Sequence, residues 1–266
     1  LNDLMLLQVR NQLQPDAGGG CTSFAWARRE GGGCLAGQNW DNDPALDPFT
    51  IVLTRRPTGK PTFTTVTQAG LIAYIGLSEA GIGVCLNSLP APSRKLGVPH
   101  YFTVRGIYEA RSLDEAIEAV RRAERAIPAN IMLATPQGPA DLEVTIDDVC
   151  VLTDPVRVTH ANHCQHPRLS SINGRFGELI QSHARLARID TLLASQEKAE
   201  PTIAALQTAL RDHQDWPHSI CRHANDDPRF GFWETVFSVI LDPAERCLYV
   251  TRGTPCTQPY EMYRLA

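Results

Sequence analysis

The stretch Gly-Gly-Gly-Cys-Thr-Ser-Phe at residues 18–24 is the most informative part of this 266-residue chain. Three successive glycines leave the backbone free to adopt geometry that other residues avoid, and they deliver a single cysteine, Cys21, into the following segment. A cysteine in this setting is a candidate nucleophile. Taken without its neighbours, the same residue is an ordinary buried thiol, which is the commoner role of a free cysteine.

Further motifs follow Cys21 in order along the chain. They are Gln-Asn-Trp-Asp at 38–41, Thr-His-Ala-Asn-His at 159–163, Ile-Cys-Arg-His at 220–223 and Thr-Val-Phe-Ser-Val-Ile-Leu-Asp at 235–242. Residues in the first three of these motifs have a structural alternative. Asp41 can form a turn before Pro44. Asn162 can be a turn residue, and Arg222 can belong to an ordinary ion pair.

The pattern of apolar residues predicts the fold class. Short runs that alternate or are β-branched predict strands at residues 51–54, 62–68, 71–76, 82–87, 130–135, 142–146, 149–153, 235–241 and 247–251. Ser112 followed by Glu115 is a capping box that predicts a helix over about 113–123. Further helices are expected over about 176–194, from the spacing of Ile180, Ala184, Ala187 and Thr191, and over about 202–212. This order predicts an α+β fold, with antiparallel sheets and helices packed outside them.

Composition excludes several classes of protein. The apolar fraction of 43% and the net charge of −4 exclude disorder as the main state. With 25 basic against 29 acidic residues and no basic run, nucleic acid is not an expected partner. No apolar stretch of 18 residues exists, so no membrane partner is expected. Eight cysteines without a Cys-x-x-Cys pair indicate reduced thiols in a cytoplasmic protein.

In this order, the motifs at residues 20–24, 37–41, 160–163 and 237–242 resemble the acyl-coenzyme A:6-aminopenicillanic acid (isopenicillin N) acyltransferase family, which also includes β-alanyl-dopamine hydrolase. The resemblance runs from about Leu7 to Tyr263. It implies an N-terminal-nucleophile hydrolase with a four-layer αββα sandwich, made as a precursor that cuts its own chain before the nucleophile. Here that bond is Gly20–Cys21, so residues 1–20 are expected to be the end of the pro-segment and 21–266 the catalytic domain. Precursors of this family usually carry more than 20 residues before the nucleophile, so the resemblance implies further residues upstream of Leu1, and we expect the two fragments to stay associated.

The resemblance also implies roles for individual residues. After cleavage, the α-amino group of Cys21, with a reference pKa of about 7.7–8.0, would take the thiol proton. Asn162 matches the oxyanion asparagine, and Asp41 matches the aspartate that assists processing. Arg222 is the candidate for a late active-site arginine that pairs with Asp41 or steers a substrate carboxylate, with Arg252 as its alternative.

The expected substrate is a small N-acyl amide or acyl donor, and no cofactor or metal is expected. Trp40, His160 and His163 are predicted to line the substrate pocket. Hydrolysis is the default reaction, and an acyl-coenzyme A-dependent N-acyltransferase is the alternative, for which Arg55, Arg56 and Lys60 offer cations. A homo-oligomer remains possible.

Two other hypotheses remain open. A non-catalytic or zinc-stabilised binding protein on the same fold predicts an intact Gly20–Cys21 bond. Its metal ligands would come from the crowded group His160, His163, Cys164 and His166, completed by His218 or His223. An ordinary Cys–His thiol hydrolase without self-cleavage predicts instead that His160, His163 or His223 is essential.

Overall fold

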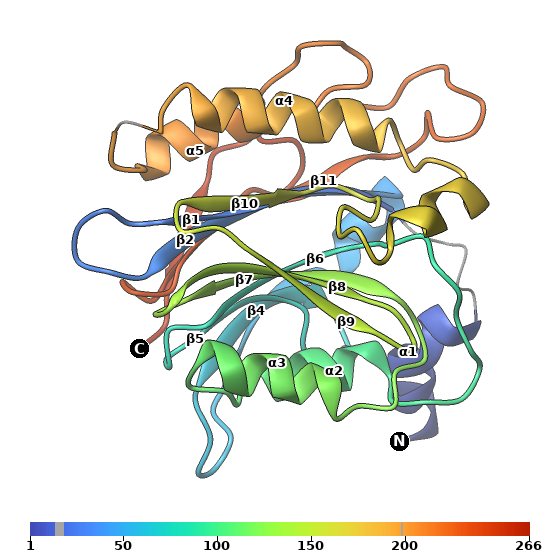
Figure 1. The fold of residues 1–266 in the computed structure, drawn as a ribbon, viewed down its shortest axis with the longest axis vertical. Coiled ribbons are helices and arrows are strands. Elements are labelled where there is room, and N and C mark those ends of the chain that lie inside the picture. Colours follow the sequence, from blue (N-terminus) through green and yellow to red (C-terminus); the bar gives the residue numbers. More distant parts are fainter. Residues whose placement is uncertain (14–18, 198) are drawn as a thin grey trace.

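Two antiparallel β-sheets lie face to face at the centre of the chain, and helices cover their outer faces (Figure 1). The structure is a computed structural model that describes residues 1–13, 19–197 and 199–266. The layers follow one another as helices, sheet, sheet and helices, so the predicted four-layer αββα sandwich is confirmed.

The first sheet carries the motifs singled out in the sequence. Its strand order is β10-β1-β2-β11-β12-β13. The strand bounds are β1 Gly20–Ala27, β2 Cys34–Asn42, β10 Arg157–His160, β11 Glu234–Asp242, β12 Cys247–Val250 and β13 Glu261–Arg264. Register places Cys21 opposite Trp40, and Asp41 opposite both Gly20 and Thr235. Residues far apart in the sequence therefore meet at one end of three neighbouring strands.

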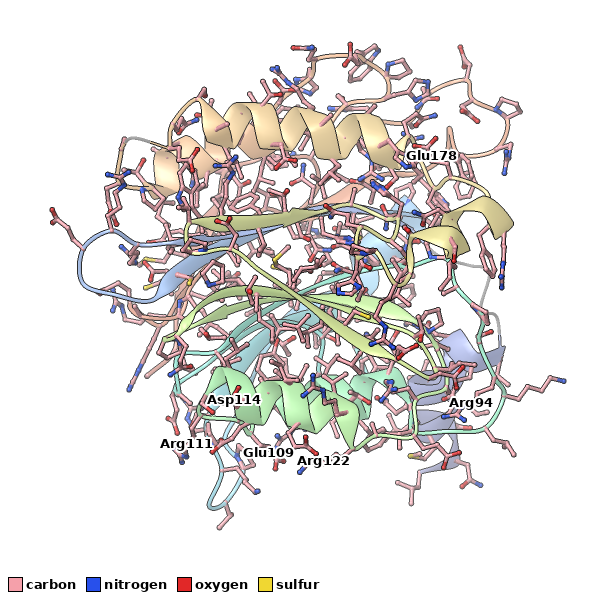
Figure 2. The ribbon with its side chains drawn as sticks, viewed as in Figure 1. Arg94, Glu109, Arg111, Asp114, Arg122 and Glu178 are labelled. Atoms are coloured by element: carbon pink, nitrogen blue, oxygen red, sulfur yellow. The ribbon has the colours of Figure 1, made fainter. Side chains whose placement is uncertain are left out.

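The second sheet runs in sequence order from β3 to β9. Its strands are β3 Thr50–Arg55, β4 Phe63–Gln68, β5 Ile75–Ser78, β6 Gly83–Asn87, β7 Ala129–Thr135, β8 Gly138–Val144 and β9 Val149–Thr153. The connection from β6 to β7 contains α2, His100–Ile107, and α3, Leu113–Arg121, which cover the outer face of this sheet (Figure 1). Glu109, Arg111, Asp114 and Arg122 point away from this layer, at the periphery of the molecule (Figure 2).

Alternation along β1 divides its side chains between two hydrophobic cores. Cys21 and Ala25 belong to the core between the sheets, together with Trp40. Phe24 and Trp26 face the other way, into a second core under α4, Ser182–Ala194, and α5, Ile203–Leu210. Burying each large apolar side chain stabilises the fold by roughly 1.5–3 kcal/mol, so both faces of this strand are fixed by packing.

The helix α4 differs from the prediction in its first residue and in the face that it buries. It begins at Ser182 rather than near residue 176, and the 3-10 helix η2, Ser170–Arg175, precedes it. Its buried side chains are those of Ser182, Arg185, Ile189 and Leu193. The predicted face, with Ala184, Ala187 and Thr191, is exposed. The helix thus buries Arg185, a cation, on a face that the pattern of apolar residues did not predict to be buried.

Two helices were not predicted, α1 at Asn2–Leu13 and α2. Polar side chains anchor α1: Gln8 Nε2 donates to the Gly70 carbonyl at 2.8 Å, and Arg10 donates to Gln68 at 3.0 Å. Most of its apolar side chains are exposed, so it lacks the usual apolar stripe. The predicted strand at 71–76 is wrong in its bounds, since β5 covers Ile75–Ser78. Among the described residues, no helix combines the length and apolar character needed to cross a membrane.

Candidate active site

Cys21 lies one residue into β1 and is only 1% exposed. The chain before it is packed very closely. A Cβ on Gly19 would lie 2.2 Å from the Asp41 carbonyl oxygen, and one on Gly20 would lie 2.6 Å from Cδ1 of Ile180. Close approach to the backbone therefore requires glycine at position 19, whereas at position 20 the obstacle is the end of the Ile180 side chain. Gly18, the first glycine of the motif, lies outside the described residues.

Asn162 follows β10 and faces the backbone of Cys21. The Cys21 N–H donates to Asn162 Oδ1 at 2.9 Å. Asn162 Nδ2 donates to the Ser88 carbonyl at 2.8 Å, and the Asn162 N–H donates to Ser182 Oγ at 2.7 Å. These contacts fix the orientation of the amide. A side-chain amide nitrogen carries two N–H groups, and the second one has no acceptor in the described part of the chain.

Arg185 on α4 completes this arrangement, and sequence reasoning missed it. Its guanidinium is fully buried and donates to the Cys21 carbonyl, to Thr22 Oγ1 at 2.8 Å and to Asn162 Oδ1 at 2.7 Å. Its Nε donates to the Ile180 carbonyl at 2.7 Å. One planar cation thus fixes the carbonyl of the cysteine and the oxygen of the asparagine at the same time. Its signal in the sequence is its position one helical turn from both Ser182 and Ile189.

Asp41 lies at the end of β2 beside the same cluster. Thr235 Oγ1 donates to Asp41 Oδ1 at 2.7 Å, whereas Asp41 Oδ2 has no hydrogen-bond partner among the described residues. The Arg222 N–H donates to Thr235 Oγ1 at 3.0 Å, so Arg222 reaches Asp41 through a threonine. Its guanidinium donates to the carbonyls of Trp233 and Phe230. The predicted ion pair between Arg222 and Asp41 is not formed.

The alternative arginine does not reach the site either. Arg252 pairs with Asp47 at 2.8 Å on the surface, with its own side chain 78% exposed. Of the arginines considered, Arg185 is therefore the one that contacts the residues around Cys21.

Burial controls the titration of the two acidic groups. Burial first, and then the Asp41 charge, raises the pKa of the Cys21 thiol to about 12. Burial raises the pKa of Asp41 to about 6, against the opposing effects of Arg185, Thr235 and Arg222. In the continuous chain the thiol is therefore neutral at pH 7, while Asp41 is mostly ionised.

Trp40 and the two predicted pocket histidines occupy different surroundings. Trp40 is buried opposite Cys21, stacks on Phe237 with ring centroids 4.9 Å apart, and donates to Tyr74 Oη at 3.0 Å. His160 is buried, with Nε2 3.1 Å from a Glu143 oxygen. It supports the sheet rather than lining a pocket.

His163 lies on the side of the site that faces α4. Its Nδ1 is 2.7 Å from Ser182 Oγ, the same hydroxyl that accepts the Asn162 N–H. Burial, followed by the neighbouring His183, lowers its pKa to about 4. This histidine is therefore neutral at pH 7 and contacts the serine that holds Asn162.

The two stacked antiparallel sheets between helix layers define the fold of the N-terminal-nucleophile hydrolases. The solved structures that resemble it share this fold. An N-acylethanolamine-hydrolyzing acid amidase ortholog from Caenorhabditis elegans matches with a TM-score of 0.60 and 16% identity, over 92% of this chain and 100% of that one. Penicillin V acylase from Agrobacterium tumefaciens matches with a TM-score of 0.65 and 12% identity, over 92% and 86% of the two chains.

Sequence comparison identifies the family. The model of the acyl-coenzyme A:6-aminopenicillanic acid acyl-transferase family matches residues 28–256, and the chain belongs to this family. The 40 kDa form of acyl-coenzyme A:6-aminopenicillanic-acid-acyltransferase from Emericella nidulans is 29% identical over 265 residues, which cover 96% of this chain and 71% of that protein. The chain is therefore an enzyme, an amide hydrolase or an N-acyltransferase.

Proposed function

We propose that this protein is a self-processing cysteine amidohydrolase that acts on the amide bond of a small N-acylated compound after cleavage of Gly20–Cys21. The observation that carries the proposal is the hydrogen bond from the Cys21 N–H to Asn162 Oδ1 at 2.9 Å. It gives the nitrogen that would become the free α-amine a fixed acceptor on the residue expected to bind the oxyanion.

In the first reaction, Cys21 Sγ attacks the Gly20 carbonyl carbon. The Gly20–Cys21 C–N bond breaks, a thioester forms, and the released nitrogen takes a proton to become an amine. Water then hydrolyses the thioester, which frees the thiol and leaves a carboxyl group on Gly20. The buried Asp41 carboxylate, with its unpartnered Oδ2, is the group we assign to assist this proton movement.

In the second reaction, the new α-amine of Cys21 takes the thiol proton and the thiolate attacks the amide carbonyl of the substrate. The free N–H of Asn162 Nδ2, together with a backbone N–H, stabilises the oxyanion. A single donor of this kind is worth about 10²–10³ in rate. The leaving amine takes its proton from the α-ammonium group, and water resolves the thioester acyl-enzyme.

The hydrogen-bond partners of the histidines disfavour the alternative of an ordinary Cys–His hydrolase. His160 contacts Glu143, and His163 contacts Ser182. Within the described residues, Cys21 Sγ has no histidine within hydrogen-bond distance. Transfer to an acceptor amine in place of water, as in the Emericella nidulans relative, is the second candidate, since both reactions share one acyl-enzyme.

The test is the intact mass and N-terminal sequence of purified wild-type protein and two cysteine variants. We expect a wild-type fragment that begins Cys-Thr-Ser-Phe and an uncut chain in Cys21→Ala. Cys34→Ala is the matched control, because Cys34 is equally buried at the other end of the β1–β2 hairpin, and it should be cut like the wild type. An uncut, folded wild type, or a cut Cys21→Ala variant, would overturn the proposal.

Processed enzyme would then be incubated with N-acyl amides and N-acylated β-lactams, alone or with an added acceptor amine. A thioester adduct on the fragment that begins at Cys21, seen by mass spectrometry, identifies the acyl-enzyme. Acyl transfer that exceeds hydrolysis at millimolar acceptor would favour the transferase.

A further inference from the structure

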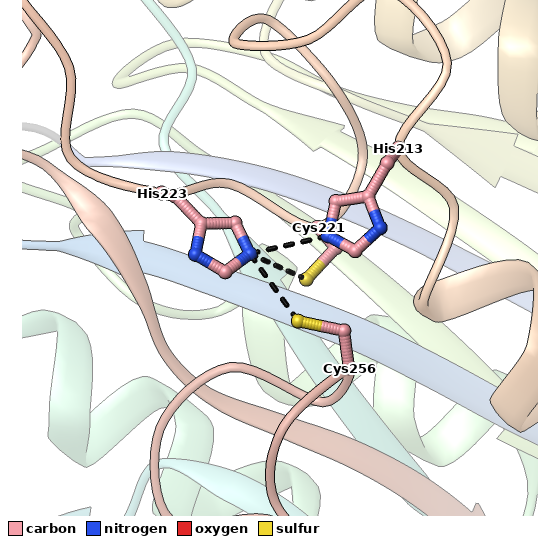
Figure 3. A group of neighbouring side chains, drawn as sticks. All are labelled: His213, Cys221, His223 and Cys256. Carbon is pink, nitrogen blue, oxygen red and sulfur yellow. Dashed lines mark hydrogen bonds between the residues drawn. The ribbon is translucent and has the colours of Figure 1, made fainter.

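Two histidines and two cysteines converge on one point outside the candidate active site (Figure 3). His213 follows α5, Cys221 and His223 lie in the segment that leads into β11, and Cys256 lies in the connection from β12 to β13. Each side chain offers one nitrogen or sulfur atom, and these four atoms all lie within 4.8 Å of one another. Three separate segments of the chain therefore contribute to the cluster.

The distances inside the cluster fit a tetrahedral metal ion. His223 Nε2 lies 3.1 Å from His213 Nε2, 3.6 Å from Cys221 Sγ and 3.3 Å from Cys256 Sγ. Zinc bonds of about 2.0–2.1 Å to nitrogen and 2.3 Å to sulfur require tetrahedral edges of roughly 3.3 Å between nitrogens and roughly 3.6 Å between nitrogen and sulfur. Movements of a few tenths of an ångström would bring these three distances to tetrahedral values, and the other pairs of ligand atoms lie within 4.8 Å of each other.

We propose that His213, Cys221, His223 and Cys256 form a zinc site of two thiolates and two imidazoles. Binding releases one proton from each thiol to solvent, so the ion and its four ligands carry no net charge. Four protein ligands leave no open position, which makes this a structural site rather than a catalytic one. His213 is exposed and Cys221 is buried, so the ion can enter from solvent and finish partly enclosed.

The protein already holds the ligand segments in place. The Cys221 N–H donates to the Asp212 carbonyl at 3.0 Å, and Ser219 Oγ donates to the Cys221 carbonyl at 2.7 Å. Arg211 Nε donates to the Pro255 carbonyl at 2.8 Å, which ties the end of α5 to the residue before Cys256. The ligands therefore belong to a preorganised group of loops.

The proposed zinc site is connected to the residues around Cys21 through Arg222. Arg222 stands between two of the ligands, and its N–H and carbonyl both bond to Thr235, which in turn donates to Asp41. A metal ion that fixes residues 221–223 thus fixes the partner of the buried aspartate. This connection gives the metal a structural role that extends to the active site.

The proposed site differs from both metal expectations drawn from the sequence. His160 contacts Glu143, and the Cys164 N–H and carbonyl both bond to the side chain of Asn173, so the crowded segment 160–166 does not converge. The proposed zinc site also departs from the sequence-based expectation that the protein holds no metal. It joins His223 to residues 10 positions before it and 33 positions after it along the chain, a spacing that no short sequence motif reveals.

The test measures zinc bound by the full chain, expressed with added zinc and gel-filtered, by elemental mass spectrometry. We expect one equivalent in the wild type and at least a tenfold loss in Cys256→Ser and His213→Ala. His218→Asn changes a histidine of the same loop outside the cluster, and Cys247→Ser changes a buried strand cysteine. Both controls should keep the full equivalent. A wild type without zinc, or equal loss in the controls, would overturn the proposal.

A second measurement needs no variant and so does not depend on their folding. Wild-type protein is freed of metal with a chelator and then titrated with Co²⁺. The titration should produce a thiolate-to-cobalt charge-transfer band that saturates at one equivalent. Zinc should then slow alkylation of Cys256 by iodoacetamide at least tenfold, mapped by peptide mass spectrometry. Absence of the band, unchanged alkylation, or a Cys221–Cys256 disulfide that persists in protein purified with a reductant would refute the site.

Discussion

Replacing Arg185 by methionine should be among the most damaging single changes in this protein. The side chain is fully buried, and its guanidinium donates to five acceptors on three segments of the chain. Methionine fills a similar volume but donates nothing. The carbonyls of Cys21 and Ile180 then lose a buried donor, and Asp41 loses the cation that most lowers its pKa.

The expected loss of unfolding free energy follows from these contacts. Each buried acceptor left without a donor costs about 1–3 kcal/mol. Relief from burying the guanidinium offsets part of this sum. We therefore expect Arg185→Met to lose about 2–5 kcal/mol of unfolding free energy. Arg185→Lys keeps the charge without the planar fork and should fall between methionine and wild type.

The assay is urea unfolding at pH 7.5, followed by tryptophan fluorescence. Arg188→Met is the matched control, because Arg188 lies three residues further along α4 and pairs with Asp212 near the surface, with its own side chain 23% exposed. A surface pair contributes about 0–1 kcal/mol, so the control should lose no more than that. Equal losses in the two methionine variants would refute the assignment of Arg185 as the buried organiser of the site.

Three further changes test other parts of the same region. Asp41→Asn should raise the unfolding free energy at pH 7.5 by up to about 3 kcal/mol, since about two pKa units at 1.36 kcal/mol each oppose ionisation. Because the pKa of Asp41 is higher in the folded than in the unfolded protein, ionisation of Asp41 lowers the stability of the wild type as the pH rises from 4 to 6. At pH 4 the carboxyl group is protonated in the folded protein, so Asp41→Asn should show no gain in urea unfolding. An equal gain at pH 4 and pH 7.5 would contradict the burial argument. Gly19→Ala places a Cβ 2.2 Å from a backbone oxygen and should lower the melting temperature far more than Gly174→Ala, where nothing lies within 4 Å; similar melting temperatures would contradict the close approach. Glu143→Gln replaces a carboxylate that accepts three hydrogen bonds and should cost about 2–3 kcal/mol in urea unfolding, with an unchanged midpoint as the contrary result.

The fold was predictable where local chemistry and burial agree. Ser112 Oγ accepts the Glu115 N–H at 3.2 Å, so Ser112 caps α3 as predicted, while the Glu115 carboxylate accepts the N–H of Arg111 rather than that of Ser112. Alternating and β-branched runs marked most strands of the second sheet. The helix α1 escaped prediction because glutamine side chains, rather than an apolar stripe, attach it to the turn after β4 and to the loop before α2.

The site was predictable only in part. The motifs around Cys21 and Asn162 stand 141 residues apart, and the structure brings them into direct hydrogen bonding. Arg185 escaped notice because an arginine within a helical pattern is usually solvated. Only the tertiary fold shows that five acceptors converge on it. The same holds for the four proposed zinc ligands, which come from separate loops.

The position of the Cys21 nitrogen explains how one cleavage could activate the enzyme without rearranging the site. Before cleavage, the nitrogen is an amide, and the buried thiol, with a pKa of about 12, has no basic amine beside it. The proposed cleavage would convert the same nitrogen into an amine that accepts a proton near pH 8. Its acceptor, Asn162 Oδ1, is already 2.9 Å away and is held by Arg185. Transfer of the thiol proton to this amine would place an ammonium group beside a thiolate within one residue, so the proposed activation adds no net charge to the buried region.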